Sequence, residues 1–445
     1  MAVSLDEIPL AEDLPAIPEG WRYELLGDLV EERGVCYGIV QPGSETSEGV
    51  PIVRVNNIRT GRIDTSDVMR VQAGIESKFQ RSRLRGGEVL ITLVGTLGEV
   101  AIVPDELRSW NVARAVGVIP VRKDPGSLWI YICLRSAFIQ HCIRTWATTT
   151  VQATFNLRDL AKLPIPIPPK ETRETIAEVL GALDDKIELN RRMNATLEAT
   201  ARALFQSWFV DFDPVRAKLD GRTPSGMDAA TAALFPDSFE ESELGHIPKG
   251  WSVKPVGDVI DCVGGGTPST SEPKYWEGGT HHWTTPKDFS SLQAPILLNT
   301  DRKLTDAGIA KISSGLLPAG TLLMSSRAPV GYLAISAIPV AINQGFIAMK
   351  CNESASNYFM LNWCQQNMAE IEGRATGTTF AEISKQNFRP IPMVLPSSDV
   401  MAAFSSQVAP HYAQITANLH QSRTLASLRD TLLPKLLSGE VCIIT

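Results

Sequence analysis

The feature that most constrains the fold is an internal repeat. Three segments recur in the same order along the 445 residues, and the offset between partners drifts from 230 to 233 before it holds at 228. One pair shares the pattern Ile-Pro-x-Gly-Trp, which begins at Ile17 and again at Ile247. The matched segments are 17–21 with 247–251, 87–103 with 320–336, and 147–168 with 375–396. This ordered series predicts two copies of one structural plan, with variable loops early in each copy and a rigid element late.

The first part of each copy is expected to be mixed α/β. Short β-branched and apolar runs are bounded by Gly, Pro and Asn, which is typical of strands separated by turns. In the first copy these runs are Val50 to Val55, Val89 to Leu93, Glu99 to Val103 and Val116 to Val121. A helix is predicted to follow at Leu128 to Thr145, with its counterpart at Ser356 to Glu372. Each part has about 150 residues, which is enough for a core of its own.

The second part of each copy is predicted to be a long helix with a heptad seam. Seam positions alternate spacings of four and three residues for more than four heptads, which is typical of coiled-coil packing. The first seam is Ile176, Leu180, Leu183, Ile187, Asn190, Asn194, Leu197, Ala201, Leu204 and Trp208. The second, 228 residues later, is Phe404, Val408, His411, Ile415, Asn418, Ser422, Leu425, Arg429, Leu432 and Leu436. Asn190 and Asn418 are equivalent, and a buried Asn sets register in such a seam.

The expected fold class is therefore mixed α/β (α+β). Two globular domains are separated by two long antiparallel helices that form an intramolecular coiled coil, with a pseudo-two-fold internal repeat. Residues 214–245 are expected to be a linker because they are rich in Gly, Pro, Ser and acids. The expected parts are a first domain 1–168, a first helix 169–213, the linker 214–245, a second domain 246–396 and a second helix 397–445.

The net charge of −7 argues against a nucleic-acid ligand only if charge is evenly spread. Residues 1–48 carry −9 and residues 228–245 carry −5, which leaves +7 on the rest of the chain. From Arg54 to Arg85, eight bases face three acids. Acidity therefore does not exclude a polyanionic ligand, although charge alone favours the ordinary interpretation of such a run, a solvated basic face.

The usual signatures of catalysis are missing from the sequence. No G-x-x-x-x-G-K-[ST] phosphate loop occurs, and Gly264–Gly266 lacks the helix that a nucleotide-binding turn needs. There is no Asn/Asp-Pro-Pro-Tyr/Phe tetrapeptide of the kind that aminomethyltransferases use. Asp261, Glu272 and Lys274 make a poor nuclease set because a proline separates the last two. His281-His282 has no further ligand at metal spacing, so the sequence predicts a binding protein without a metal site.

Cysteine use and hydropathy bear on location. Seven scattered cysteines form no C-x-x-C pair, and the N-terminus lacks a basic stretch followed by an apolar one. No run of eighteen apolar residues occurs, so no membrane span is expected. These features favour a reduced, cytoplasmic protein without a signal peptide.

Several motifs, taken in order, resemble one family: the DNA specificity (S) subunits of type I restriction–modification enzymes. The duplicated Ile-Pro-x-Gly-Trp starts and the two long helices are shared with that family. The more specific motifs are GGGTPSTSEPKYW (264–276), HHWTTPKDF (281–289), AINQGF (341–346), the stretch 165–194 that starts IPIPPKETRETIAEVLG, and LRDTLLPKLLSGEV (428–441). The first copy departs from the pattern, with Ala113-Arg114-Ala115 where the second has Ile342-Asn343-Gln344.

The resemblance implies a division of labour. Each domain is expected to read one half of a bipartite, asymmetric site on double-stranded DNA, and the helices to set the spacer and dock two methyltransferase (modification) subunits. Restriction subunits complete the enzyme. S-adenosylmethionine is expected on the modification subunits, ATP and Mg on the restriction subunits, and no cofactor on this chain.

Base-reading candidates are polar residues placed after apolar runs, because Arg suits guanine and Asn or Gln suits adenine. The first-domain candidates are Arg54, Asn56, Asn57 and Arg59, and those of the second are Thr267, Thr284, Lys287, Arg327, Asn343 and Gln344. Thr92 and Thr96 are DNA-binding candidates for another reason: the glycines of the turn 92–98 allow its backbone to come close to phosphates. The helix residues expected to form partner-binding helices are Ile176, Leu180, Leu183, Ile187, Asn190, Leu197, Leu204, Val408, Ile415, Asn418, Leu425 and Leu432. Their outward faces, near 171–194 and 405–427, are the expected docking surfaces.

Two other classes remain open at the level of sequence. One is a self-contained DNA methyltransferase or nuclease with duplicated recognition domains, which needs a catalytic motif that the sequence does not display. The other is a coiled-coil scaffold that binds only proteins.

Overall fold

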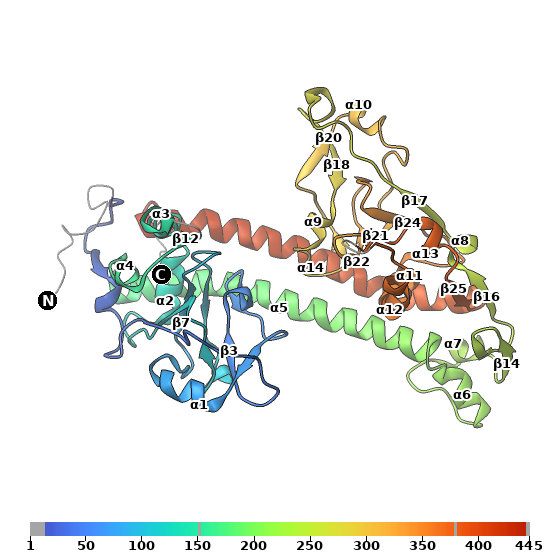
Figure 1. Cartoon of the computed structure of the whole chain (residues 1–445), viewed down its shortest axis with the longest axis horizontal. Helices are drawn as coiled ribbons and strands as arrows, with labels where there is room; N and C mark the ends of the chain where they lie inside the picture. The colour runs from blue at the N-terminus through green and yellow to red at the C-terminus, as the bar shows by residue number, and fades with distance from the viewer. Residues whose placement is uncertain (1–13, 150–152, 378–380, 442–445) are drawn as a thin grey trace. The chain divides into compact units, whose positions relative to one another are not determined.

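The computed structural model describes residues 14–149, 153–377 and 381–441, so residues 1–13 of the acidic N-terminal stretch and Cys442 lie outside it. The chain divides into two compact units (Figure 1). Unit 1 consists of Met1–Ile187 and Thr424–Thr445, and unit 2 of Glu188–Arg423. Each unit contains one α/β domain and one stretch of each long helix.

Unit 1 is built on two main sheets. The larger has the order β2-β10-β7-β8 and is antiparallel, whereas the smaller, β6-β3-β9, pairs β3 with β9 in parallel. The strands of these sheets are β2 (Cys36–Tyr37), β10 (Val116–Ile119), β7 (Val89–Thr92), β8 (Val100–Ile102), β6 (Met69–Val71), β3 (Val50–Val53) and β9 (Asn111–Val112). Three two-stranded pairs complete it: β1 (Arg22–Leu25) with β13 (Pro164–Ile167), β4 (Ile58–Arg59) with β5 (Arg62–Ile63), and β11 (Thr148–Thr149) with β12 (Ala153–Thr154).

Unit 2 repeats the topology of the two main sheets, with one strand added to the larger. Its larger sheet has the order β17-β24-β21-β22-β19, and its smaller one, β20-β18-β23, again pairs its central and last strands in parallel. The strands are β17 (Asp261–Gly264), β24 (Phe346–Lys350), β21 (Leu322–Ser326), β22 (Val330–Ser336), β19 (Ile296–Leu297), β20 (Arg302–Leu304), β18 (His281–Thr284) and β23 (Val340–Ile342). Two-stranded pairs join β14 (Phe239–Ser242) to β15 (Gly245–Pro248) and β16 (Ser252–Pro255) to β25 (Pro392–Leu395). The predicted α/β fold and internal repeat are confirmed.

The predicted helices 128–145 and 356–372 are each broken in two. In unit 1 the break falls at Ser136, whose hydroxyl accepts the backbone N–H of Ile139 and so starts a second helix. The pieces are α2 (Ser127–Leu134) and α3 (Ala137–Trp146), and in unit 2 they are α11 (Asn357–Gln366) and α12 (Met368–Gly373). Outside residues 213–245, the other short α-helices are α1 (Ala73–Glu76), α4 (Leu157–Ala161), α8 (Val256–Val259), α9 (Pro286–Phe289), α10 (Asp306–Ile309) and α13 (Lys385–Phe388).

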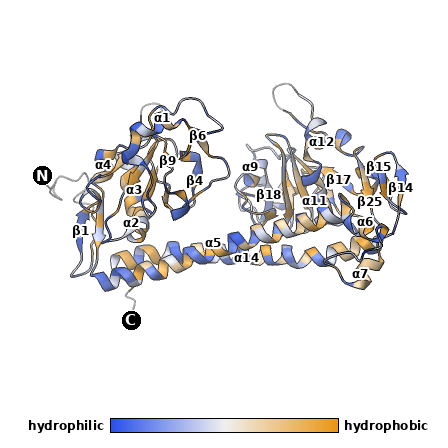
Figure 2. Ribbon diagram, turned by 90° about the horizontal axis from the view of Figure 1, so that it is seen from below, coloured by the Kyte–Doolittle hydropathy of each residue, from blue (hydrophilic) through white to orange (hydrophobic). Residues whose placement is uncertain are grey.

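The two long helices are α5 (Lys170–Phe209) and α14 (Ser398–Ser438). Hydrophobic and hydrophilic residues alternate along both (Figure 2), as a seam requires. In unit 2 they run antiparallel, because Asn190 bonds to Ser422 whereas Phe205, farther along α5, packs against Phe404, nearer the start of α14. The predicted antiparallel pairing is therefore confirmed.

The seam asparagines lie together in unit 2. The Asn190 amide nitrogen lies 2.9 Å from Gln421 Oε1 and 3.4 Å from the carbonyl oxygen of Asn418. Asn418 in turn donates to Asn194 Oδ1 at 2.9 Å. All three asparagines are buried and bond across the helix pair, which fixes its register, while Asn190 Oδ1 has no hydrogen-bond partner within the described residues.

Residues 214–245, expected to be a linker, are largely folded. They form α6 (Asp213–Leu219), α7 (Ala229–Ala233) and β14. Val215 and Phe235 are buried in the unit 2 core, where Phe235 meets Trp208 edge-on at 5.0 Å. The linker prediction rested on the average composition of the segment and so overlooked these few apolar residues. They pack an otherwise polar segment against the end of α5.

The described residues contain no helix that is long and apolar enough to cross a membrane. The six cysteines within the described ranges are free thiols, and burial raises the pKa of each. These thiols therefore serve as small apolar groups of the cores.

Candidate nucleic-acid interface

In unit 1 the ends of four strands meet at one turn, residues 113–115. The Ile39 N–H, just past β2, donates to Val112 O at 2.7 Å, and the Ala113 N–H donates to Val53 O at the end of β3. The Leu93 N–H, just past β7, donates to Ala115 O at 2.8 Å. We call this segment, and its equivalent 343–345 in unit 2, the strand-end turn.

Unit 2 reproduces these three bonds. The Gly266 N–H donates to Ile342 O at 2.9 Å, the Asn343 N–H to Thr284 O at 3.1 Å, and the Ser326 N–H to Gly345 O at 2.8 Å. Loops that are far apart in the sequence are thus held side by side by main-chain bonds. Because these bonds are independent of side chains, the loop residues can differ between the copies without changing the frame.

One glycine in each unit makes this close approach possible. A Cβ on Gly38 would lie 1.9 Å from Val112 O, and a Cβ on Gly265 would lie 2.0 Å from Ile342 O. Only glycine lets the two backbones approach so closely. The two residues therefore hold the same structural position.

The structure gathers the predicted residues of unit 2 around its strand-end turn. Gln344 and Thr267 are both exposed, and the Thr267 hydroxyl donates to Gln344 Oε1 at 2.6 Å. Asn343 turns its Oδ1 back to accept the Gly345 N–H at 2.9 Å. The Arg327 guanidinium lies 3.7 Å from the Glu382 carboxylate.

The other two predicted residues of unit 2 have different surroundings. Thr284 is fully buried, with its hydroxyl near the Asp288 carboxylate, so it positions the following turn and presents no side chain. Lys287 is exposed on α9. That helix begins with a capping box, in which Asp288 accepts the Thr285 N–H at 2.7 Å.

In unit 1 the predicted residues divide in the same way. Asn57 is 2 % exposed, and its side chain accepts the Arg54 N–H and donates to the carbonyls of Asp64 and Asp67. Asn57 therefore pins the loop, as Asp288 does in unit 2. The Arg54 guanidinium pairs with Asp67 at 3.1 Å. Asn56 and Arg59 are exposed.

The remaining two lie beside β7. Thr92 is fully buried, and its hydroxyl accepts the Glu99 N–H at 3.0 Å, which closes the turn that follows the strand. Thr96, at the tip of that turn, is exposed. The polar side-chain atoms of Thr92, Asn57 and Thr284 are bonded inside the fold, so these three residues position their loops.

The structural alignment of the two strand-end turns differs by one residue from the alignment expected from the sequence. The main-chain bonds align Ala113-Arg114-Ala115 with Asn343-Gln344-Gly345, not with Ile342-Asn343-Gln344. Arg114 therefore occupies the place of Gln344. It is exposed, and among the described residues no side-chain partner is recorded for it. The sequence comparison missed Arg114 because no identical residue marks this turn in both copies.

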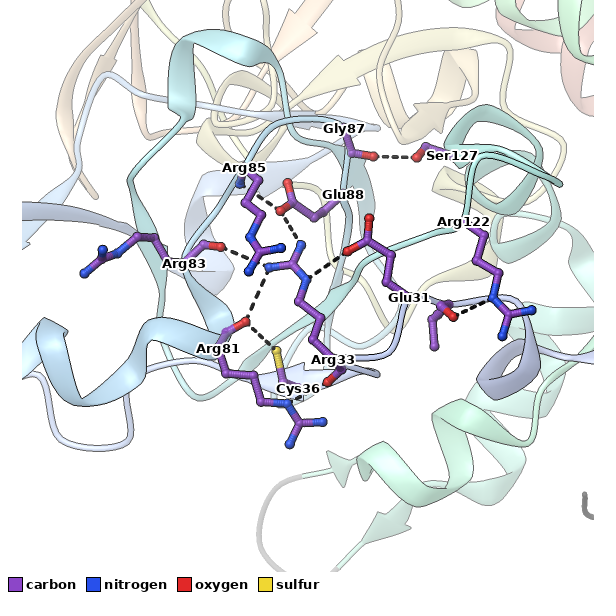
Figure 3. Close-up of polar contacts among 11 residues, drawn as sticks. Glu31, Arg33, Cys36, Arg81, Arg83, Arg85, Gly87, Glu88, Arg122 and Ser127 are labelled. Atoms are coloured by element: carbon purple, nitrogen blue, oxygen red, sulfur yellow. Dashed lines mark hydrogen bonds and ion pairs between the residues drawn. The ribbon is translucent and has the colours of Figure 1, made fainter. Parts of the chain in front are cut away.

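A buried ion pair supports the basic stretch of unit 1 (Figure 3). Arg33 contacts Glu88 at 2.5 Å and donates to the carbonyls of Arg81 and Arg83. The Arg85 N–H donates to the same Glu88 oxygen. Because Glu88 is buried, removing Arg33 leaves its charge unpaired, whereas Arg33 also lies 3.4 Å from the Glu31 carboxylate.

Two residues of the basic stretch are engaged internally. Arg83 makes two hydrogen bonds to Glu76, which lower the pKa of that carboxyl group despite its burial. The Arg81 guanidinium donates to the carbonyls of Arg33 and Val35. Arg59, Lys78 and Arg85 are exposed, with no side-chain partner recorded among the described residues. The exposed cations of the stretch are thus fewer than its composition suggests.

The second domain supports its strand-end turn with aromatic residues. The Trp283 indole N–H donates to Gly266 O at 3.1 Å. Trp276 meets Trp283 edge-on, and Arg302 lies over both rings, 3.6 Å and 5.2 Å from their centroids. His281 pairs with Asp306. No group of three or more potential metal ligands occurs among the described residues.

The predicted partner-binding helix residues face inward. Ile176 and Leu180 belong to the core of unit 1, and Val408 and Ile415 to that of unit 2. The others are buried or half-buried: Leu183, Ile187, Asn190, Leu197, Leu204, Asn418, Leu425 and Leu432. Only the opposite helix faces remain available to a partner.

Comparisons with known proteins agree on one family. The model of the type I restriction modification DNA specificity domain matches residues 18–199 and 248–408. Over 334 residues the chain is 29 % identical to the specificity subunit of the type I restriction enzyme HindI of Haemophilus influenzae, covering 66 % of this chain and 72 % of that protein. Over 163 residues it is 34 % identical to the MjaIX specificity subunit of Methanocaldococcus jannaschii, covering 36 % of this chain and 38 % of that one.

Among solved structures, the S subunit of a type I restriction-modification system from M. genitalium is similar in fold. The TM-score is 0.52 at 15 % identity, and the match covers 95 % of this chain and 98 % of that one. At this identity the likeness concerns the fold alone.

Proposed function

This chain belongs to the family of type I restriction modification DNA specificity proteins, and from that membership we propose that it is the DNA-recognition subunit of a type I restriction–modification enzyme. Each domain reads one half of a bipartite, asymmetric site on double-stranded DNA. The long helices set the spacing between the half-sites.

The observation that carries the proposal is the duplicated strand-end turn. The same three main-chain bonds hold loops with different exposed side chains in the two units. The same main-chain hydrogen bonds with different exposed side chains suit a protein that reads two different short sequences. Specificity comes from side chains at base edges, and the main-chain bonds keep these side chains in position.

Catalysis is assigned to other subunits. The exposed polar residues at and beside the two strand-end turns include Arg114, Gln344 and Lys287, which suit base edges and phosphates. We assign S-adenosylmethionine to two modification subunits, and ATP and Mg to restriction subunits. The cytoplasm, where chromosomal DNA resides, is the expected location.

The outward faces of the helix pair are the proposed docking surface for the modification subunits. Glu188 on α5 forms ion pairs with Arg191 and Arg192 on the same helix. Leu189 and Met193 of the same stretch are exposed, so the outward face carries both charged and apolar groups. Because the seam is filled by the chain's own residues, a partner has to bind these outward faces.

The test is methylation sequencing in cells that co-express this chain with its modification subunits. We expect one bipartite motif, and exchange of either domain for that of a relative should change only one half. A motif that survives both exchanges, or methylation that requires only this chain, would contradict the proposal. The first result would favour a scaffold, and the second a self-contained enzyme.

A further inference from the structure

Resting on the proposed function, we infer that Arg114 and Gln344 are equivalent base-reading residues, so that the first half-site contains a guanine where the second contains an adenine. The equivalence comes from the main-chain frame. Ala115 accepts a bond from the residue just after β7, and Gly345 accepts the equivalent bond from the last residue of β21. Ala113 and Asn343 donate the same bond to the end of β3 or β18.

Two further exposed positions flank each of these residues. The first is Val40, which follows the bonded Ile39, and its equivalent Thr267, which follows Gly266. The second is Asn56 and its equivalent Lys287, each one residue before the loop pin Asn57 or Asp288. All three pairs differ between the copies, whereas the bonds beneath them are the same.

Spacing places position 114/344 at the centre of this set. Neighbouring strands lie about 4.8 Å apart, so three positions on adjacent strand ends span about 10 Å. That length corresponds to roughly three base pairs at a rise of about 3.4 Å. The central residue is therefore the best placed of the three to reach a base edge, with a neighbour on either side.

The chemistry of the central residue differs between the copies. Arg114 has an exposed guanidinium, whose parallel N–H groups match the O6 and N7 acceptors of guanine. Its neighbour Val40 is 47 % exposed and offers no polar group to engage it. Gln344 accepts a hydrogen bond from Thr267, which orients the amide so that its NH₂ group points away from the threonine. An oriented amide can donate to adenine N7 while its oxygen accepts from N6.

The experiment measures binding of the complex with its modification subunits to a randomised duplex library, followed by sequencing. Arg114→Gln should change one base of the first half-site from guanine to adenine and lower affinity for the original site about 10- to 100-fold. Gln344→Arg should make the opposite change in the second half-site only. Arg114→Lys keeps the charge but loses the paired donors, so guanine preference should fall while affinity for random duplexes stays.

Matched controls are Arg144→Gln on α3 and Gln366→Arg at the end of α11, the same exchanges at exposed positions away from the turns. Both should leave the motif unchanged. The inference is overturned if the Arg114→Gln complex keeps the wild-type motif, with the affinity and melting temperature of the wild-type complex. It is also overturned if this variant loses affinity equally for every sequence. Neither result affects the proposed function, which fails only if the wild-type complex shows no sequence preference.

Discussion

The two units secure their helix pairs at the same place by different chemistry. In unit 1 the Asp184 carboxylate of α5 pairs with Arg429 of α14 at 2.5 Å and with Arg135, at the end of α2, at 2.7 Å. In unit 2 the corresponding contact is neutral. There the Asn362 amide of α11 donates to the Tyr412 hydroxyl of α14 at 3.2 Å.

The offset of 228 shows that the two contacts are equivalent. Asp184 corresponds to Tyr412, and Arg429 corresponds to the buried Ala201 of α5. An ionic contact in one copy is thus replaced by an aromatic residue, an amide and a small side chain in the other. The comparison teaches that the repeat preserves backbone geometry and helix pairing, while the side-chain chemistry of an equivalent contact can differ.

The largest loss of stability should follow from disturbing the close backbone approach that both units share at the strand-end turn. Gly265→Ala and Gly38→Ala each place a Cβ about 2 Å from a carbonyl oxygen of the neighbouring strand, so the loop has to move. We expect a loss of at least about 3 kcal/mol of unfolding free energy in the affected unit. Urea denaturation, monitored by hydrogen exchange within each unit, measures it.

The matched control is Gly266→Ala, whose Cβ would meet no atom within 4 Å. It should cost less than about 1 kcal/mol. Equal effects of Gly265→Ala and Gly266→Ala would show that the close approach does not determine stability there.

The second prediction contrasts the two helix contacts. Asp184→Ala leaves Arg135 and Arg429 facing each other without the carboxylate, and we expect a loss of about 2 kcal/mol in unit 1. That is below the cost of breaking a fully buried pair, because the three side chains are 16–24 % exposed. Tyr412→Phe removes one neutral hydrogen bond, so unit 2 should lose about 1 kcal/mol. Hydrogen-exchange protection of α5 and α14 in each unit distinguishes the two.

Salt provides the control for this contrast. The unit 1 loss should shrink at high salt only modestly, because the charges are partly buried, and the Tyr412→Phe loss should not depend on salt at all. If Asp184→Ala costs no more than Tyr412→Phe, the ionic contact contributes nothing beyond its neutral counterpart.

The third prediction concerns pH and is confined to unit 2. Burial raises the pKa of Glu198 on α5 to about 7, and Arg202 opposes the shift. The folded state therefore keeps a proton that the unfolded state releases near the usual value of 4.5, so this contribution to stability is complete below that value and is lost as pH rises through 7. Since 17 % of the side chain is exposed, the loss from pH 5 to pH 8 should be on the order of 1–2 kcal/mol.

Glu198→Gln should abolish this part of the pH dependence and raise unit 2 stability at pH 8. Thermal unfolding at pH 5 and pH 8 checks it, with Glu188→Gln on the same helix as the control. A wild-type unit 2 that is equally stable at both pH values would rule out the protonated form.

The sequence predicted those features that depend on repetition and periodicity. The heptad pattern located both long helices, because a seam of ten positions outweighs local irregularities. It missed the helix break at Ser136, because the apolar pattern continues across this residue. The break depends on a single hydroxyl, which accepts the Ile139 N–H and starts a new helix. It also missed the folded segment 214–245, whose packing depends on isolated residues such as Phe235.

The sequence indicated where polar residues gather, but not which of their side chains are exposed. Polar residues after apolar runs do lie beside the strand-end turns, because strand ends meet there. The sequence could not distinguish exposed residues from buried ones that hold a loop in place. Asn56 and Asn57 are adjacent and of the same type, yet only Asn57 is buried. Arg114 was missed because its equivalence to Gln344 exists only in main-chain hydrogen bonds.

The smallest expected effect separates phosphate contacts from base contacts within unit 1. Arg59 is exposed with no side-chain partner recorded among the described residues, whereas nearby Arg54 is held by Asp67. Arg59→Gln should weaken DNA binding a few-fold for all sequences and reduce the slope of log affinity against log salt by about 1, with the motif unchanged. Arg54→Gln should change that slope less, because its charge is already partly neutralised. A salt titration of both variants in the complex measures the difference, and an altered motif in Arg59→Gln would show that base reading extends beyond the strand-end turn.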